Sequence, residues 1–310
     1  VNGGQTTASI FNARNDRKNS IDLSKVYVQM KLSVIQSAEM MDEIVPRIST
    51  FANTQNKVQI ADFSANDPFH RRIEELSRTI WAPTQGGLKP RNWFYERARG
   101  QYADMLSRET TTRRKKDYKE EHPLFTKTDL AKCENTWDQL PYWVSEGAQK
   151  NFNRFMLRLK EHRSFVPDEK YYHNLIAKMI LFRQTEKLVQ KQQYGGYRAN
   201  IVTYTLAFLS YKTAQKIDLE RIWKEQSLTR ALEWEIVEIS KFVQRAIVNP
   251  PGGANAGEWC KKEQCWKKIQ EHEYALSADL QAELISVEQP TRRSLPATGS
   301  IESPTKEDYD

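Results

Sequence analysis

The sequence predicts an α+β fold in which a small mixed α/β domain precedes a predominantly helical domain. Apolar residues alternate along 26–34, which is typical of a half-buried strand. After residue 121 they recur at spacings of three and four, which is typical of helices. A charged stretch without apolar periodicity separates these two patterns. We therefore expect a mixed domain over 1–107, a basic linker over 108–120, a helical domain over 121–286 and a disordered tail over 287–310.

Local signals place the elements of the mixed domain. Asp67 followed by Pro68 is typical of a helix N-cap and its first helical residue. Pro46 is expected to kink the helix that contains it. The expected elements are, in order, a glycine turn at 2–7 that opens a helix at 8–13, the strand at 26–34, a helix from about residue 38, a helix at 69–81 and a strand at 93–95.

Apolar residues at helical spacing place the elements of the second domain, and Asn249 followed by two prolines ends the longest of these helices. The helical faces are formed by Phe152, Phe155, Met156 and Leu159; by Leu175, Ile176, Met179 and Ile180; by Leu219, Ile222 and Trp223, behind an Asp218 cap; and by Leu232, Ile236, Ile239, Val243 and Ile247.

Composition excludes two classes of protein. The longest apolar run, 201–209, is too short for a membrane span of about 18 residues, so no membrane association is expected. Three cysteines are too few for a disulfide-stapled secreted fold, which makes the cytoplasm the expected location. Since the chain starts at Val1 and runs directly into a motif, we also expect further sequence upstream, including an N-terminal domain of the same chain.

The most informative motif is the turn at the start of the chain. Two glycines permit a close approach of the backbone to a ligand, and the following helix start offers free N–H groups to an anion. The motif consists of Asn2, Gly3, Gly4, Gln5, Thr6 and Thr7, and it lacks the lysine and spacing of a Walker A loop. A plain helix cap is the alternative interpretation.

Two further polar segments are candidates for the same site. Asn53 and Gln55 follow an apolar helix, where a C-cap and a turn are the alternative. Arg97 and Arg99 alternate along an expected strand, so they would share one face and bind a phosphate or carboxylate, unless they form surface ion pairs. We hypothesise that these four residues and the turn at 2–7 converge on one polar pocket that binds a nucleotide or a nucleic-acid phosphate.

The basic run of Arg113, Arg114, Lys115 and Lys116 is a separate candidate for phosphate contact with DNA or RNA, with a solvated linker as the alternative. A metal site is not expected. Cys260 and Cys265 with His272 lack the spacing and the fourth ligand of structural zinc, so core packing of the two thiols is the favoured interpretation.

Six motifs stand out by their order and spacing along the chain. They are Val1–Thr7, Ala52–Asn56, Phe94–Tyr102, Pro141–Phe152, Gln193–Asn200 and Glu258–Trp266. Taken together, these motifs resemble the AIPR family of bacterial abortive-infection phage-resistance proteins. The resemblance covers roughly residues 1–270 and implies a role in defence against phage. It supplies no catalytic residues, and it places the first motif well inside a longer chain.

The turn at 2–7 also looks like the Gly/Gln-rich turn of ParB-like and GmrSD-type domains, which binds a nucleoside triphosphate. Those domains carry a basic residue directly after the turn, where this chain has threonine. If Arg97 and Arg99 supply that charge, Glu96 or Asp62 would hold Mg²⁺ or orient water. The chain would then be an NTPase or part of a nuclease-type defence enzyme. The alternative is a non-catalytic module that binds nucleic acid or senses phage for an upstream nuclease or effector.

Overall fold

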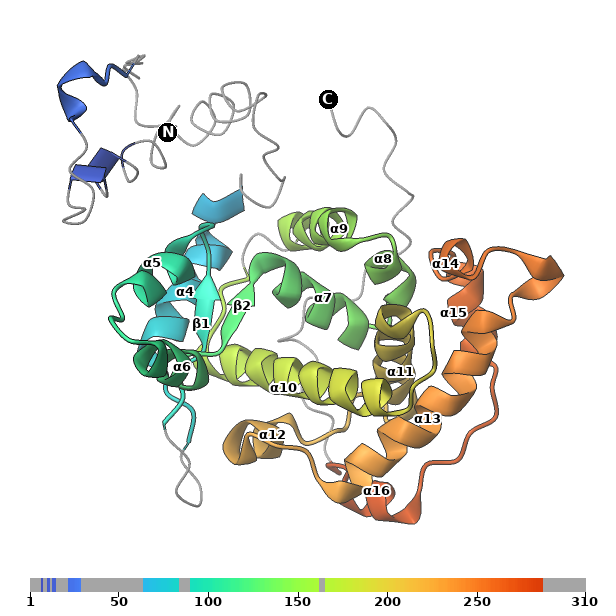
Figure 1. Cartoon of the computed structure of the whole chain (residues 1–310). Helices are drawn as coiled ribbons and strands as arrows, with labels where there is room; N and C mark the ends of the chain where they lie inside the picture. The colour runs from blue at the N-terminus through green and yellow to red at the C-terminus, as the bar shows by residue number, and fades with distance from the viewer. Residues whose placement is uncertain are drawn as a thin grey trace. The chain divides into compact units, whose positions relative to one another are not determined.

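The structure is a computed structural model, which describes residues 7, 10–11, 13–14, 22–28, 64–83, 90–161 and 165–286 (Figure 1). Contacts between Cα atoms group the chain into two units, 1–63 and 64–310, and each is described by itself. The domain limits expected at 107 and 121 would separate segments that fold independently of one another. A division by contacts does not measure independent folding, so these limits stay a prediction.

Unit 1 is described only in part. Thr7, Ile10 and Phe11 are helical, as are residues 13–14, which agrees with a helix opening after the glycine turn. The short 3-10 helix η1 (Leu23–Lys25) follows. Residues 26–28 form no strand, and the remainder of the strand and helix expected up to residue 51 lies outside the described residues, as does the expected tail after 286.

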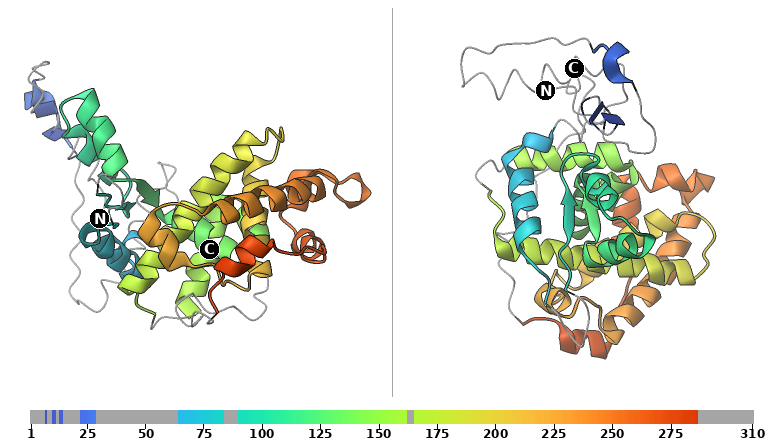
Figure 2. Two further views of the ribbon diagram at one scale, coloured as in Figure 1. Left: turned by 90° about the horizontal axis from the view of Figure 1, so that it is seen from below. Right: turned by 60° about the vertical axis from the view of Figure 1, so that its left-hand side comes forward.

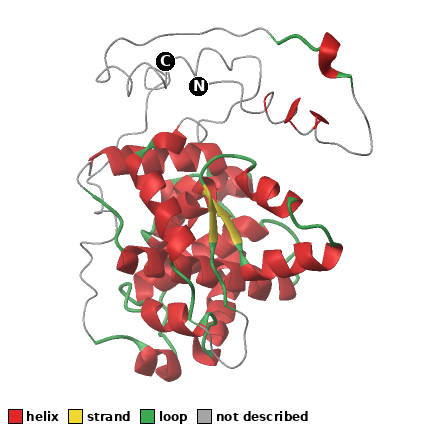
Figure 3. Cartoon of the chain, turned by 90° about the vertical axis from the view of Figure 1, so that its left-hand side faces the viewer, coloured by secondary structure: helices red, strands yellow, loops and turns green. Residues whose placement is uncertain are grey.

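The first part of unit 2 is built around a small parallel sheet, in which Tyr95 of β1 lies opposite Phe125 of β2 (Figure 3). Two helices connect the strands, because a parallel pair requires a crossover. The elements are η3 (Ser64–Asn66), α4 (Pro68–Thr79), β1 (Phe94–Glu96), α5 (Gln101–Ser107), α6 (Thr112–Glu121) and β2 (Leu124–Thr126). Asp67 caps α4 by accepting from the Phe69 N–H at 2.9 Å, as predicted.

The second part of unit 2 is helical. The long helix α10 packs against α4, α7, α11, α12 and α13 and forms the centre of the core (Figures 1 and 2). Asp218 caps α12, and Asn249 ends α13, as predicted. The elements are α7 (Lys127–Trp137), α8 (Pro141–Ser145), α9 (Ala148–Glu161), α10 (Glu169–Lys191), α11 (Arg198–Lys212), α12 (Leu219–Glu225), α13 (Arg230–Val248), η4 (Pro251–Gly253), α14 (Ala256–Trp259), α15 (Glu263–Gln270) and α16 (Ala278–Glu283).

The structure corrects the interpretation of the charged stretch at 108–120 as a loop, because most of it forms α6. Thr111 caps this helix by accepting from the Arg114 N–H at 3.2 Å. Arginine, lysine and glutamate have high helix propensity, which supports a helix without an apolar face. No residue of α6 is buried, so the sequence carries no apolar period to reveal it.

The described residues agree with the expected α+β class, since they are mainly helical and contain one two-stranded sheet. Across this part of the chain, no helix combines the length and the apolar character that crossing a bilayer would require.

Candidate functional site

Arg97 and Arg99 do not share a strand face as predicted. The strand β1 ends at Glu96, and the chain then bends towards Gly100, whose φ of +94° favours glycine. Arg97 turns back onto α4 and donates from Nε to Glu74 Oε2 at 2.5 Å. Arg99 is exposed in the turn. The expected alternative of an ion pair is therefore correct for Arg97.

Glu74 gathers the polar side chains that surround Arg97. Its Oε1 accepts from Gln101 Nε2 at 2.8 Å and lies 3.5 Å from a guanidinium nitrogen of Arg78. Arg78 also donates to the carbonyl of Tyr95 and stacks over a ring of β1. This carboxylate therefore holds α4, β1 and α5 together.

Glu96 already has local partners. Its Oε1 accepts from the backbone N–H groups of Gly100 and Tyr102, both at 3.2 Å, at the start of α5. A carboxylate there satisfies N–H groups that a helix start leaves unpaired. Asp62, the other carboxylate considered for Mg²⁺, lies outside the described residues.

A buried hydrogen bond lies behind this surface. His70 is fully buried, and its Nδ1 forms a hydrogen bond with the Tyr95 hydroxyl at 2.6 Å. Burial lowers the pKa of His70 to about 3, with smaller effects from the charges of Lys127 and Arg97. The imidazole is consequently neutral at pH 7, which suits it to accept this hydrogen bond and not to exchange protons with a ligand.

Helix α6 carries the basic run in full solvent exposure. All four residues from Arg113 to Lys116 are exposed, as is Lys119 one turn later. Arg114 Nε lies 3.2 Å from Glu109, and Lys116 Nζ lies 3.9 Å from Glu120. Within the described part of the chain, Arg113, Lys115 and Lys119 have no carboxylate within ion-pair distance. The helix lies with α4 and α5 at one end of unit 2, away from α14 and α15 (Figure 1).

The end of α6 contacts an exposed aromatic residue that no sequence motif marks as part of a site. Trp81 meets His122 edge to face, with 5.9 Å between the ring centroids. His122 in turn lies 4.4 Å from the ring of Tyr118. The sequence signal for this part of the surface was the spacing of Lys115, Lys119 and His122, which places the three residues on one side of a helix.

Three motifs that carry the family resemblance meet at the opposite end of unit 2, where α8, α11 and α15 contact one another. Asn200 donates from Nδ2 to Ser145 Oγ at 3.0 Å, and the Tyr204 hydroxyl donates to the Cys260 carbonyl at 2.8 Å. Tyr197 begins α11 with a φ of +58°. The first bond joins two of these motifs directly, and the second joins the third motif to α11.

The thiols of Cys260 and Cys265 are free and buried, which is the core packing that the sequence favoured. His272 stacks on Phe242 with 4.2 Å between the ring centroids. Across the described residues, no three or more histidine, cysteine or acidic side chains are grouped to hold a metal ion.

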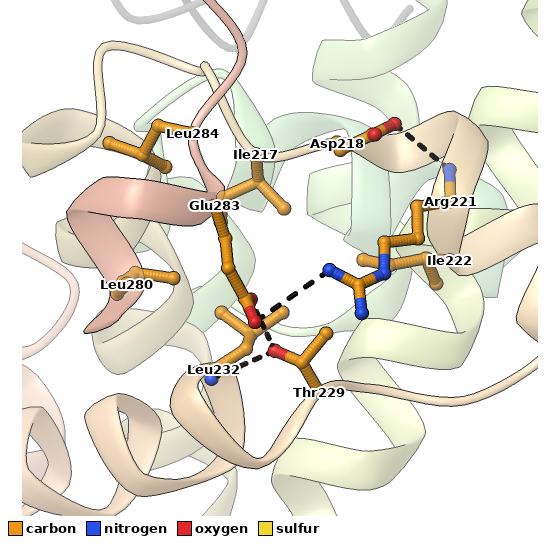
Figure 4. Close-up of a pocket in the computed structure, with 9 residues that line it drawn as sticks. All are labelled: Ile217, Asp218, Arg221, Ile222, Thr229, Leu232, Leu280, Glu283 and Leu284. Carbon is orange, nitrogen blue, oxygen red and sulfur yellow. Dashed lines mark hydrogen bonds and ion pairs between the residues drawn. The ribbon is translucent and has the colours of Figure 1, made fainter.

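A small pocket lies between α12, α13 and α16 (Figure 4). At its rim, Glu283 accepts from Thr229 Oγ1 at 2.6 Å and lies 3.6 Å from a guanidinium nitrogen of Arg221. Thr229 also caps α13. The polar groups thus pair across the pocket and hold α16 in place. Apolar side chains of Ile217, Ile222, Leu232, Leu280 and Leu284 line the rest.

The remaining predicted site residues are in unit 1. Thr7 is a helical, exposed residue. Residues 2–6, Asn53 and Gln55 lie outside the described residues. Their convergence with Arg97 and Arg99 on one pocket stays a prediction.

Comparison with known proteins identifies the family. A family model described as "AIPR protein" matches residues 1–251, which is well over half of the chain. No curated protein and no solved structure matches. The AIPR family points to abortive-infection defence against phage. The chain belongs to the AIPR family.

Proposed function

We propose that this AIPR protein takes part in abortive-infection defence by binding nucleic-acid phosphates along α6. The observation that carries the proposal is a helix that buries none of its residues and presents Arg113–Lys116 and Lys119 to solvent. A helix without a buried face gains little from tertiary packing, so its surface is free to serve a partner. Clustered lysine and arginine neutralise phosphates and release counterions, which drives binding to DNA or RNA.

The ion pairs of α6 do not oppose this role. Arg114 and Lys116 are exposed and pair with Glu109 and Glu120 at the surface, where such pairs contribute about 0–1 kcal/mol. A phosphate can displace them at little cost. Arg113, Lys115 and Lys119 have no carboxylate partner among the described residues, so they bind phosphate without breaking an ion pair.

Replacing Arg113, Arg114, Lys115 and Lys116 together by alanine is expected to lower the affinity for labelled oligonucleotides about tenfold or more. The dependence of log Kd on log salt should also become shallower, by about 0.7 to 0.9 for each phosphate that the variant no longer neutralises. Fluorescence anisotropy with single-stranded and duplex DNA at 50–200 mM salt measures both quantities.

The matched control removes the same charge from α9 and α10, by alanine at the exposed residues Lys160, Lys170, Lys187 and Lys191. Equal losses of affinity in the two variants would contradict a site on α6. Absence of any binding by the unmodified chain would contradict nucleic-acid binding altogether.

A second candidate function, nucleoside triphosphate binding at residues 2–7, is favoured by the helical conformation of Thr7 and Ile10, which follow the two glycines in the sequence. A helix that opens behind two glycines offers N–H groups to phosphates. A triphosphate with Mg²⁺ is expected to raise the Tm of the chain, and alanine at Gln5 and Thr6 should abolish the shift. No shift with any of the four triphosphates would contradict this function.

A further inference from the structure

We infer that the α6 site prefers single-stranded to duplex nucleic acid, because Trp81 offers a stacking surface for an unpaired base. This inference rests on the proposed function and specifies the class of nucleic acid that α6 binds. Four observations on the described residues support it: the exposure of Trp81, the support behind its ring, the cations in line with it, and the position of the acidic residues.

Trp81 is exposed but held in place. Its side chain is 52% exposed, directly after the end of α4. The next residue, Ala82, donates its N–H to the carbonyl of Arg91 at 2.7 Å, which anchors the backbone. His122 meets the indole at an interplanar angle of 66°, an edge-to-face contact that can cover at most one face of the indole. Because Trp81 is also exposed, its other face is available for stacking.

Behind Trp81, a row of aromatic rings continues into the core. His122 lies 4.4 Å from Tyr118, which lies 5.8 Å from Tyr102, which lies 5.1 Å from the buried ring of Phe94. Hydrogen bonds fix the row, since the Tyr102 hydroxyl donates to the His122 carbonyl at 2.8 Å. A stacking surface fixed in advance loses little entropy when a base binds to it.

Two cations of α6, Lys115 and Lys119, lie in line with His122, which contacts Trp81. Lys115, Lys119 and His122 are spaced i, i+4 and i+7, so they lie within about 60° of the helix circumference. His122 contacts Trp81, so Lys115 and Lys119 lie on the side of α6 that leads to the indole. We therefore expect these two lysines to bind the phosphates of a strand whose base stacks on Trp81.

The acidic residues of α6 lie away from this line. At 3.6 residues per turn, Asp117, Glu120 and Glu121 lie about 100° or more around the helix from Lys115 and Lys119. The line of lysines is therefore purely cationic, although the helix as a whole carries both signs of charge. This arrangement favours a polyanion that passes along one side of α6.

A single strand and a duplex differ in what Trp81 can bind. Both present phosphates to Lys115 and Lys119, but the base faces of a duplex are already stacked on one another. An unpaired base exposes its π-face, and stacking on an aromatic side chain contributes regardless of base identity. Trp81 should consequently add affinity for single strands only, whereas the lysines act on both forms.

Three variants test this inference, with binding measured for a labelled single-stranded thymidine oligonucleotide, an RNA of the same length and a duplex. Trp81→Ala is expected to weaken binding of the two single strands about 5- to 100-fold and to leave duplex binding unchanged. Trp81→Phe should retain most of the single-strand affinity, because phenylalanine can still stack. Lys115→Ala with Lys119→Ala should weaken all three ligands.

Matched controls exist for each change. Trp234 on α13 is 54% exposed, so Trp234→Ala removes an equally exposed indole elsewhere. Lys187 and Lys191 form an exposed i, i+4 lysine pair on α10 that matches the pair on α6. Unchanged duplex affinity of Trp81→Ala also shows that the variant is folded.

The possible outcomes separate the inference from the proposed function. If Trp81→Ala binds single strands as tightly as the unmodified chain while the lysine variant binds all ligands more weakly, the inference is overturned and the α6 site stands. The same holds if Trp81→Ala weakens single-stranded and duplex binding equally. If the unmodified chain binds none of the three ligands, the proposed function itself is overturned.

Discussion

Replacing Lys178 by methionine is expected to lower the free energy of unfolding by about 3–5 kcal/mol, because it leaves a buried carboxylate without its partner. Lys178 Nζ on α10 donates to Glu134 Oε2 on α7 at 2.8 Å. The side chains are 6% and 0% exposed, respectively. Burial raises the pKa of Glu134, and the charge of Lys178 opposes that shift. Without Lys178, Glu134 must either remain charged in an apolar core or take up a proton.

The double variant Glu134→Leu with Lys178→Met is the control, because it removes both charges and keeps similar volumes. It should recover most of the stability that the single variant loses. Urea unfolding at pH 7 measures both free energies. If the two variants were equally destabilised, the loss would come from packing around position 178 and not from an unpaired charge.

A second large effect is expected from pH, through His70. The ordinary pKa of a histidine is 6.5. In the folded chain, burial disfavours the charged ring of His70 and lowers its pKa to about 3. Above pH 6.5 both the folded and unfolded forms hold it neutral. As the pH falls below 6.5, only the unfolded chain takes up the proton, so stability is lost. Between pH 6.5 and 5 this loss amounts to about 2 kcal/mol.

His70→Asn is the matched variant, since an amide retains an acceptor for the Tyr95 hydroxyl but does not titrate. Whatever stability it loses at pH 7.5, its free energy of unfolding should change less between pH 7.5 and 5 than that of the unmodified chain. Burial also lowers the pKa of His173, so a smaller dependence on pH remains. Parallel pH profiles of the two chains would contradict the assignment to His70. Urea titrations at several pH values provide the comparison.

The sequence predicted those helices that bury one face, because apolar residues then recur at a regular spacing. The apolar stripe from Leu232 to Ile247 became α13, and Asp67 and Asp218 cap helices as expected. Helix α6 escaped prediction because none of its residues is buried, which means that no period marks it. Lys178 and Glu134 pair across two helices although they are 44 residues apart in the sequence, and no local pattern encodes such a contact.

The sequence likewise predicted one part of the candidate site and missed another. The basic run at 113–116 is accessible as a phosphate-binding surface requires, but sequence spacing alone did not separate Lys115 from its neighbours. Trp81 is distant in sequence and meets the end of α6 through His122. Arg97 was expected to face a ligand, but it contacts Glu74, because β1 ends one residue before it.

The position of α6 between two paired strands has a consequence for how this protein can change. Its ends are fixed by the crossover from β1 to β2, while none of its own residues is buried. Substitutions on its outer surface therefore alter charge and ligand preference with little effect on folding. A defence protein with such a helix can adapt its binding surface to a changing opponent while the scaffold beneath it stays the same.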